Sequence, residues 1–461
     1  MNQISLRNVL PILLGLSLLV LSMPRASAVT VAEVKSPSGI TAYLAEDHTT
    51  PVVAISFSFA GGTALDPVDK QGLSTLGAGL LDEGAGDLDS FAFQSALDDQ
   101  AITLHASADR DAIQGQLVTT TATLADGTRL LRLALNQPRF DPDALERVRR
   151  EVLVNLAAES EVPGHLASRR LFTDLFGDHP YAREEAGTPE TVAVLTRADV
   201  QAWARTRLAR DRLLIGVAGD ITAQALAGVL DEIFAGLPTT SPVAATLPQA
   251  TVSSAPRIDR VVRDLTQTTI YIGAPGIARG DPDWYAATVA DYIFGSGSFS
   301  SRLMNEVREK RGLAYTVRSQ LAPFDYGPVM IVSAGTRANA SEQSLAVIRD
   351  EWAKMVNQGP TAKEIEGAKE YLTGAWPLRF TSTESIAGLL VQIQHDHLGL
   401  DYFERRNQLI NAVTLDDVHR VAQRLYKPDE LTVVIVGRAP TAGAADVAPL
   451  RMPPMRKREP E

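Results

Sequence analysis

The chain repeats a helix-and-strand unit near the end of each half. Thr196 begins a helical pattern that leads into the apolar run 213–219, and Thr414 begins a similar pattern that leads into 431–437. The two threonines lie 218 residues apart, and so do the glycines that end the two runs. Each threonine precedes an acid by three residues, which is typical of a capping box. This shared spacing indicates an internal duplication and predicts two similar domains.

Composition shifts suggest where these domains begin and end. Residues 236–256 are rich in Pro, Thr, Ser and Ala, so we expect a linker between an N-terminal domain, residues 29–235, and a C-terminal domain, residues 257–438. Residues 439–461 contain five prolines and a late basic cluster. This composition predicts a disordered tail.

Strands precede long helices in both predicted domains. In the first, we expect strands at 40–45, 52–60, 102–107 and 113–119 and helices at 71–81, 90–98, 124–136, 141–161 and 162–176. In the second, we expect strands at 268–274, 313–321 and 329–334, helices at 282–294 and 301–310, and several further helices up to 426. This order favours the α+β class, with two homologous α/β sandwich domains that each place helices on one face of a sheet.

The N-terminus has the features of a secretory signal. Arg7 precedes an apolar run of about 15 residues, and Ala26-Ser27-Ala28 offers small residues to a signal peptidase. A single membrane anchor is the alternative, although a span needs roughly 20 apolar residues. No later segment is apolar enough to cross a membrane. We therefore expect a signal peptide over residues 1–28, a periplasmic location, and no membrane association after cleavage.

Charge and cysteine usage exclude several kinds of function. The formal net charge of −11 and the pI near 5.3 argue against nucleic-acid binding, which usually involves a basic surface. The chain has no cysteine, which excludes thiol catalysis, cysteine-ligated zinc and iron–sulfur clusters. Stability must therefore come from core packing without disulfides.

Several glycine-containing motifs occur in the same order as in a known peptidase family. The first half has Gly61-Gly62-Thr63, Gly72-Leu73, Gly177-Asp178-His179-Pro180-Tyr181 and Gly187-Thr188-Pro189. The second has Gly295-Ser296-Gly297, Ser301-Arg302-Leu303, and Arg308 followed by Gly312-Leu313-Ala314-Tyr315. With these motifs the chain resembles the pitrilysin and mitochondrial processing peptidase family, the inverted zincins, over almost its whole length after residue 28.

Active members of that family carry His-x-x-Glu-His on the first helix of the N-terminal half. By this resemblance the two zinc-binding histidines map onto Thr75 and Gly79, and the general base maps onto Ala78. The third ligand, a glutamate of a later helix, maps onto about Leu156. These residue types cannot coordinate zinc. We therefore expect no metal and no zinc- or base-type catalytic residue in this chain.

Two glutamates leave the position of the third ligand open. Glu151 and Glu159 lie near Leu156 and could shift the alignment by a few residues. The missing histidines do not depend on this choice.

The second half keeps the residues that bind substrate in active members. The resemblance implies that Arg308 and Tyr315 contact the substrate backbone and the oxyanion formed during cleavage, opposite the zinc. It also implies that Gly295 and Gly297 belong to a loop bordering the reaction chamber, although they could form a simple flexible turn. In the family, the strand equivalent to Thr103–Asp109 can lie at a sheet edge and pair with substrate. The sequence leaves open whether this chain keeps that use.

Keeping the substrate-binding residues without the zinc motif predicts a non-catalytic subunit. We expect the two domains to form half of a hollow clamshell that pairs, as a heterodimer or larger assembly, with a homologous subunit. That partner would hold the zinc, and the pair would hydrolyse peptides. Two alternatives remain open. One is a catalytically silent structural or peptide-binding protein, like the core subunits of respiratory complexes. The other is a homodimer with an unrelated activity.

Two polar clusters have simpler interpretations. His395 and His397 flank Asp396 in a predicted helix, so the histidines point about 200° apart and are poorly placed to share a metal. We interpret this segment as a solvated helix or a weak polar patch. The acid-rich region around Asp98, Asp99, Asp109 and Asp111 is likewise expected to be solvated.

Overall fold

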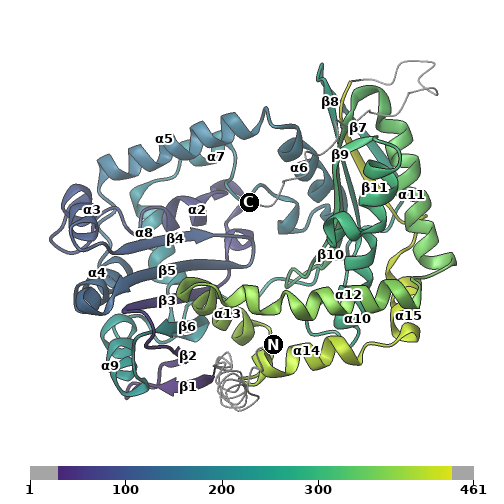
Figure 1. Ribbon diagram of the computed structural model, residues 1–461. Helices are drawn as coiled ribbons and strands as arrows, with labels where there is room; N and C mark the ends of the chain where they lie inside the picture. Colours follow the sequence, from purple (N-terminus) through teal and green to yellow (C-terminus); the bar gives the residue numbers. More distant parts are fainter. Residues whose placement is uncertain (1–29, 245, 439–461) are drawn as a thin grey trace, which may run out of the picture. The chain divides into compact units, whose positions relative to one another are not determined.

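The computed structural model describes residues 30–244 and 246–438 (Figure 1). The predicted signal peptide and tail lie outside these ranges. No helix within them combines the length and the apolar character that a membrane span requires.

The first half forms a six-stranded sheet in the order β1-β2-β6-β3-β5-β4. Neighbouring strands are antiparallel except β2 and β6, which are parallel. The elements of this half are β1 (Val31–Lys35), β2 (Thr41–Glu46), β3 (Val52–Ala60), α2 (Leu73–Ala78), α3 (Ser90–Asp98), β4 (Thr103–Ala108), β5 (Ala112–Thr120), α4 (Leu124–Asn136), α5 (Pro142–Glu159), α6 (Pro163–Phe176), η6 (Pro180–Ala182), α7 (Pro189–Ala193), α8 (Arg197–Arg207), β6 (Leu213–Gly219) and α9 (Ala223–Phe234).

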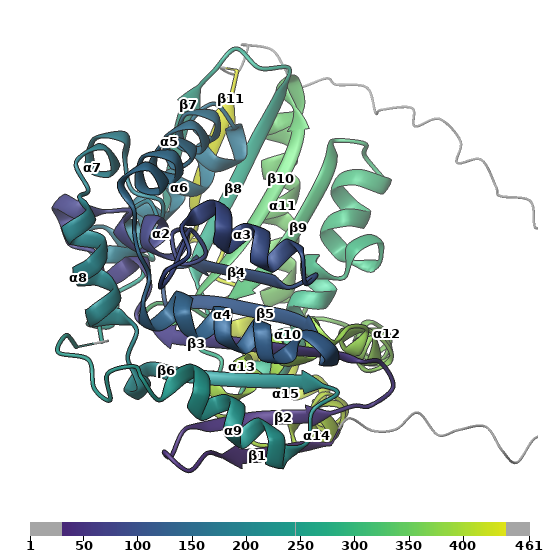
Figure 2. The same cartoon turned by 90° about the vertical axis from the view of Figure 1, so that its left-hand side faces the viewer.

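One face of this sheet carries the main core of the first half. Val53, Ile55, Phe57 and Phe59 alternate along β3 and are almost fully buried, as the period of two in a strand requires. Phe57 lies opposite Gly115 of β5, where an added Cβ would come within 2.1 Å of the Phe57 ring. Figure 2 looks onto this face, with α3, α4 and α9 in front of the strands.

The second half forms a five-stranded sheet in the order β7-β11-β8-β10-β9. Its elements are β7 (Arg257–Val262), β8 (Gln267–Pro275), α10 (Trp284–Asp291), the π-helical turn η8 (Tyr292–Ser296), η9 (Ser298–Ser300), the π-helical turn η10 (Met304–Glu309), β9 (Ala314–Ala322), β10 (Val329–Arg337), α11 (Ser341–Asn357), α12 (Ala362–Gly374), α13 (Thr383–His395), α14 (Tyr402–Ala412), α15 (Leu415–Leu425) and β11 (Thr432–Gly437). The two sheets with their separate cores confirm the predicted architecture of two α/β domains.

The predicted repeat is confirmed in both hydrogen bonding and topology. Thr196 and Thr414 cap α8 and α15, and Asp199 and Asp417 close the two capping boxes. The strands that follow these helices pair alike: β6 lies between β3 and β2, and β11 lies between β8 and β7. In each case the first partner is antiparallel and the second is parallel.

Some elements differ from the sequence-based expectation. α9 follows β6, so the first half does not end with that strand. β1 and β7 were not predicted, because neither has the alternation of buried residues that marks a half-buried strand. The helix expected at 71–81 is only the six-residue α2. Residues 236–256, apart from 245, contain neither helix nor strand.

Each half contributes one helix to the other half's sheet. α13 packs on β6, β3 and β2 of the first sheet, and α6 packs on β8 and β11 of the second. Glycines allow both approaches: a Cβ on Gly216 would lie 2.2 Å from the Ala387 carbonyl oxygen, and one on Gly273 would lie 2.6 Å from Leu175. The prediction of helices on one face of each sheet was therefore incomplete.

Candidate functional site

The helix that carries the zinc ligands in active relatives is part of the hydrophobic core here. Gly77 of α2 faces Trp203, and a Cβ at this position would come within 2.6 Å of the indole ring. Trp203 Nε1 donates a hydrogen bond of 3.1 Å to Ser74 Oγ, which in turn donates to Asp66 Oδ1 at 2.6 Å. Burial raises the pKa of Asp66 to about 6. α2 therefore contributes packing and a buried polar network.

The three ligand positions and the general-base position of the zinc motif hold no side chain that could serve in these roles. The Thr75 hydroxyl donates to the Glu185 carbonyl oxygen at 3.0 Å, and Ala78 is fully buried. A Cβ on Gly79 would already lie 3.4 Å from a methyl group of Val148 on α5. Leu156 is buried in a small apolar cluster that also contains Val152 and Val192.

These residues do not fit a zinc ion, which needs about three nitrogen, oxygen or sulfur ligands from the protein. The two glutamates near Leu156 do not change this. Glu151 is exposed, and Glu159 lies 3.7 Å from His165. Within residues 30–244 and 246–438, no group of three His, Asp or Glu side chains could hold a metal.

Arg308 lies on an irregular helical segment. It belongs to the π-helical turn η10, and such turns occur often at functional sites. Its guanidinium carbon lies 5.1 Å from the centre of the Phe299 ring, and its Nε lies 3.7 Å from Glu309 Oε1. The side chain retains 24% of its exposure. Arg308 is therefore accessible but partly constrained by an aromatic neighbour.

Tyr315 is turned outward by a β-bulge. Gly335 of β10 pairs with Thr316 of β9, whereas Thr336 pairs with Ala314, so Tyr315 is the extra residue. Regular alternation would bury either Tyr315 or Thr316, but both are exposed between the buried Ala314 and Val317. Bulges of this kind redirect side chains beside active sites. Tyr315 accordingly keeps 47% of its surface accessible on an edge strand.

The two glycines predicted to form a chamber loop allow close packing. Gly295 is buried in the π-helical turn η8 rather than in a loop, and a Cβ there would lie 2.6 Å from the Ser319 amide nitrogen of β9. Gly297 ends that turn, where a Cβ would lie 2.5 Å from the Tyr292 carbonyl oxygen. Both η8 and η10 contact β9. The structure therefore gathers the elements that carry Gly295, Arg308 and Tyr315 around one strand.

The strand predicted at Thr103–Asp109 forms an edge of the first sheet. β4 covers Thr103–Ala108 and pairs only with β5 among the strands that the structure describes. Its outer side therefore leaves backbone groups available for another strand. Pairing of substrate with this edge stays a prediction.

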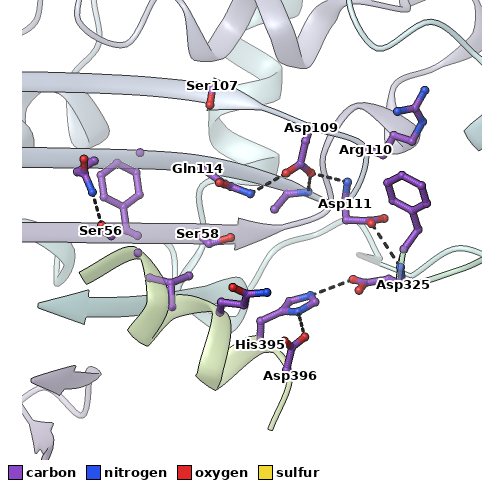
Figure 3. A pocket seen from close by; sticks show the side chains of 18 of the residues that line it. Ser56, Ser58, Ser107, Asp109, Arg110, Asp111, Gln114, Asp325, His395 and Asp396 are labelled. Atoms are coloured by element: carbon purple, nitrogen blue, oxygen red, sulfur yellow. Dashed lines mark hydrogen bonds and ion pairs between the residues drawn. The ribbon is translucent and has the colours of Figure 1, made fainter. Parts of the chain in front are cut away.

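A polar cluster that the sequence did not predict joins distant parts of the chain (Figure 3). His395, at the end of α13, lies 3.1 Å from Asp325 through Nε2 and 3.1 Å from Asp396 through Nδ1. The Asp325 amide donates to Asp111 Oδ2 at 3.3 Å, and Asp111 also bonds the Tyr181 hydroxyl. These residues lie at one end of a pocket of about 600 Å³ between α13 and the polar face of β3, β4 and β5.

The acid-rich region around Asp98, Asp99, Asp109 and Asp111 was predicted to be solvated, and this prediction was wrong for part of the region. Asp98 and Asp99 are exposed. Asp109 instead accepts bonds from the Asp111 and Ala112 amides at 2.8 Å, and burial raises the pKa of Asp111 to about 6. The sequence did not indicate that these residues lie together, because His395 and Asp325 are 70 residues apart and Asp325 and Asp111 are 214 apart.

The His395 cluster predicts a specific pH dependence of stability. Hydrogen bonds to Asp325 and Asp396 raise the pKa of His395 to about 10, well above that of an unfolded histidine. The stabilisation is thus complete below about pH 6.5 and is lost as the pH rises towards 10. Because 39% of this side chain is exposed, we expect His395→Gln to cost only about 1 kcal/mol at pH 6. Urea unfolding should show the difference from the wild type shrinking by pH 10; a difference that grows with pH contradicts the assignment.

The fold and the non-ligating residues at the motif positions agree with the resemblance to the inverted zincins. Residues 195–372 match the family described as Peptidase M16 inactive domain. Over 423 residues the chain is 26% identical to the "Non-peptidase homolog YmxG" of Helicobacter pylori, covering 89% of this chain and 95% of that protein. It is 27% identical over 303 residues to the "Uncharacterized zinc protease YmxG" of Bacillus subtilis, covering 64% of this chain and 71% of that protein.

Known structures show the same fold. A peptidase M16 inactive domain from Pseudomonas fluorescens superposes with a TM-score of 0.84 and 26% identity, covering 92% of this chain and all of that one. The periplasmic protease PqqL of Escherichia coli shares the fold at a TM-score of 0.76 and 14% identity, over 91% of this chain but 46% of that one. These matches support an inactive member of the M16, or pitrilysin, family.

Proposed function

We propose that this chain is the zinc-free subunit of a heteromeric metallopeptidase and contributes Arg308 and Tyr315 to its partner's active site. One contrast supports the proposal best. The zinc-motif positions are filled by Thr75, Ala78, Gly79 and Leu156, whereas a π-helical turn and a β-bulge keep Arg308 and Tyr315 accessible. Such irregular backbone around β9 is typical of functional sites.

The two side chains suit the stabilisation of an oxyanion. Arg308 carries a permanent charge with several fixed donors, and Tyr315 offers a hydroxyl donor. Donors positioned before the reaction are worth about 3–4 kcal/mol when charge develops on a carbonyl oxygen. Such donors help only if another group activates the water. We assign that group to the zinc and glutamate of a homologous His-x-x-Glu-His subunit.

The length relation to PqqL supports a paired arrangement. The fold match covers 91% of this chain but only 46% of PqqL, so a second chain of similar size would make up the remaining length. The substrates on this proposal are peptides or unfolded segments, and the free edge of β4 is available to pair with them. The N-terminal sequence with Ala26-Ser27-Ala28 favours the periplasm as the place of assembly.

Reconstitution tests the proposal. This chain and the homologous His-x-x-Glu-His chain of the same organism are purified separately and then mixed, with peptide hydrolysis and metal content measured for each sample. We expect hydrolysis chiefly in the mixture, with about one zinc per pair, carried by the partner. Stoichiometric zinc together with peptidase activity in this chain alone contradicts the proposal. Failure to associate, with the partner fully active alone, favours a silent structural or peptide-binding protein.

A further inference from the structure

A second cavity lies between α6, the segment around η6 and the sheet of the second half. Its volume is about 260 Å³, and its lining is rich in cationic groups. The charged lining residues are Arg110, His165, Arg169, Arg183, Glu184, Glu185 and Arg318. Four arginines therefore face two carboxylates, although the whole chain carries a formal charge of −11. The lining of the cavity is therefore positively charged, in contrast to the negative net charge of the chain.

Part of this charge is neutralised within the protein. Arg110 forms an ion pair with Glu185 and lies over the Phe172 ring at 4.1 Å. Figure 3 shows the Arg110 side chain turned away from Asp111 and the acidic cluster. Glu184 lies 3.2 Å from His165 Nε2. The cavity is thus left with an excess of positive charge from the remaining arginines.

Two of these arginines come from opposite walls of the cavity, and their guanidinium groups have hydrogen-bond donors available for a ligand. Arg318 projects from β9, and its guanidinium makes no hydrogen bond or ion pair with another residue of the described ranges. Arg169 projects from α6, and its nearest acidic contact is a long one of 3.8 Å to Glu184. Arg183 uses one nitrogen to bond the Asp66 carbonyl oxygen at 3.0 Å. Arginine forks on facing walls can bind a small oxyanion with several charge-assisted hydrogen bonds.

The neutral lining specifies the kind of anion. Register places Arg318, Ser333 and Tyr271 in one row across β9, β10 and β8, so that hydroxyl groups adjoin the arginines. Ile331 and Phe172 add an apolar wall. An anion that carries a short apolar or polar chain fits this combination better than an isolated inorganic ion. Thr75, at the vestigial zinc position, bonds Glu185 of the same lining, so the cavity adjoins the former catalytic region.

We propose that this cavity binds the C-terminal carboxylate of a peptide, held mainly by Arg169 and Arg318. The choice of a peptide rests on the proposed function, whereas the affinity for an oxyanion rests on the cavity alone. Binding here would anchor one end of a peptide on this subunit while its chain extends towards the reaction chamber.

Equilibrium binding to the purified full chain, without any partner, tests this inference. The probes are N-acetyl-tetra-alanine with a free C-terminus, the same peptide as its C-terminal amide, and inorganic phosphate, each followed by calorimetry. We expect the free acid to bind at least tenfold more tightly than the amide, and Arg318→Gln and Arg169→Gln each to weaken the acid by tenfold or more. Arg129→Gln is the matched control and should bind as the wild type does, because the Arg129 side chain on α4 is 42% exposed and does not line the cavity.

The outcomes separate the two sources of oxyanion. Arg318→Lys keeps the positive charge but loses the two-pronged guanidinium geometry. We expect this variant to bind the free acid with intermediate affinity and to unfold at the same temperature as the wild type. Equal binding of acid and amide, or unaltered binding by Arg318→Gln, overturns the proposal. Phosphate binding without acid binding also overturns it, in favour of a free-anion site. Because no peptidase activity is measured, the result does not depend on the reconstitution experiment.

Discussion

Replacing Arg308 with alanine is expected to lower kcat of the reconstituted peptidase about 100- to 1,000-fold, with little change in KM. The reason is that a donor to the developing oxyanion stabilises the transition state more than the bound substrate, and removal of one such donor typically has this effect. Arg308→Ala should leave zinc content and subunit association intact, because the side chain lies on the accessible turn η10. Steady-state kinetics of the mixture make the measurement.

The second proposed donor, Tyr315, can be tested with a smaller chemical change. Tyr315→Phe retains the ring and removes only the hydroxyl, so a loss of roughly 10- to 100-fold in kcat corresponds to one hydrogen bond to a charged group. Lys310→Ala is the matched control: Lys310 directly follows η10, pairs with Glu306 and is 56% exposed. If Arg308→Ala and Tyr315→Phe both keep full activity in the mixture, Arg308 and Tyr315 have no role in catalysis.

Trp203→Ala is expected to lower the free energy of unfolding by about 3–5 kcal/mol, the range for truncating a fully buried tryptophan. Trp203 is 2% exposed, packs on Gly77 of α2 and bonds Ser74. The loss therefore combines a cavity with the loss of the indole hydrogen bond to Ser74, whose hydroxyl still donates to Asp66. Urea unfolding measures it, and Phe91→Ala on α3, with 83% of Phe91 exposed, is the control that should stay close to the wild type.

A double-mutant cycle tests why α2 contains Gly77. In the wild type, Gly77→Ala should destabilise the protein, because its Cβ would lie 2.6 Å from the Trp203 ring. In the Trp203→Ala background the same change should be neutral or stabilising, since the ring is gone and alanine favours helix by about 1 kcal/mol. Additive effects would falsify the idea that the former zinc helix is now held by this contact.

Each half of the chain depends on a helix of the other half to cover its sheet. α6 buries Leu171 and Leu175 against the second sheet, and α13 lies on the first. Cutting the chain in its linker would leave each sheet without one covering helix unless the halves stay associated. The two halves are therefore similar in topology but share their packing.

Much of the fold could be predicted because its signals are local. The bounds of β3, α3 and α4 agree with the strand and helix periodicities, and the boxes at Thr196 and Thr414 formed as their spacing indicated. β1 and β7 escaped prediction because edge strands with mixed exposure have little periodicity. Likewise, α2 was predicted too long at both ends: Gly72, in the left-handed region, is its N-cap, and Gly79 is its C-cap.

The features of the candidate site also divide into those that the sequence determines and those that depend on the tertiary structure. The sequence by itself determined the duplication, the loss of zinc-ligating residue types at Thr75 and Gly79, and the presence of Arg308 and Tyr315, because residue identity and spacing are written in the chain. Only the tertiary structure decided that a bulge turns Tyr315 outward, that His395 joins Asp325, and that Arg169 and Arg318 face one cavity. These features depend on strand register and on packing between residues far apart in sequence, which short-range patterns do not encode.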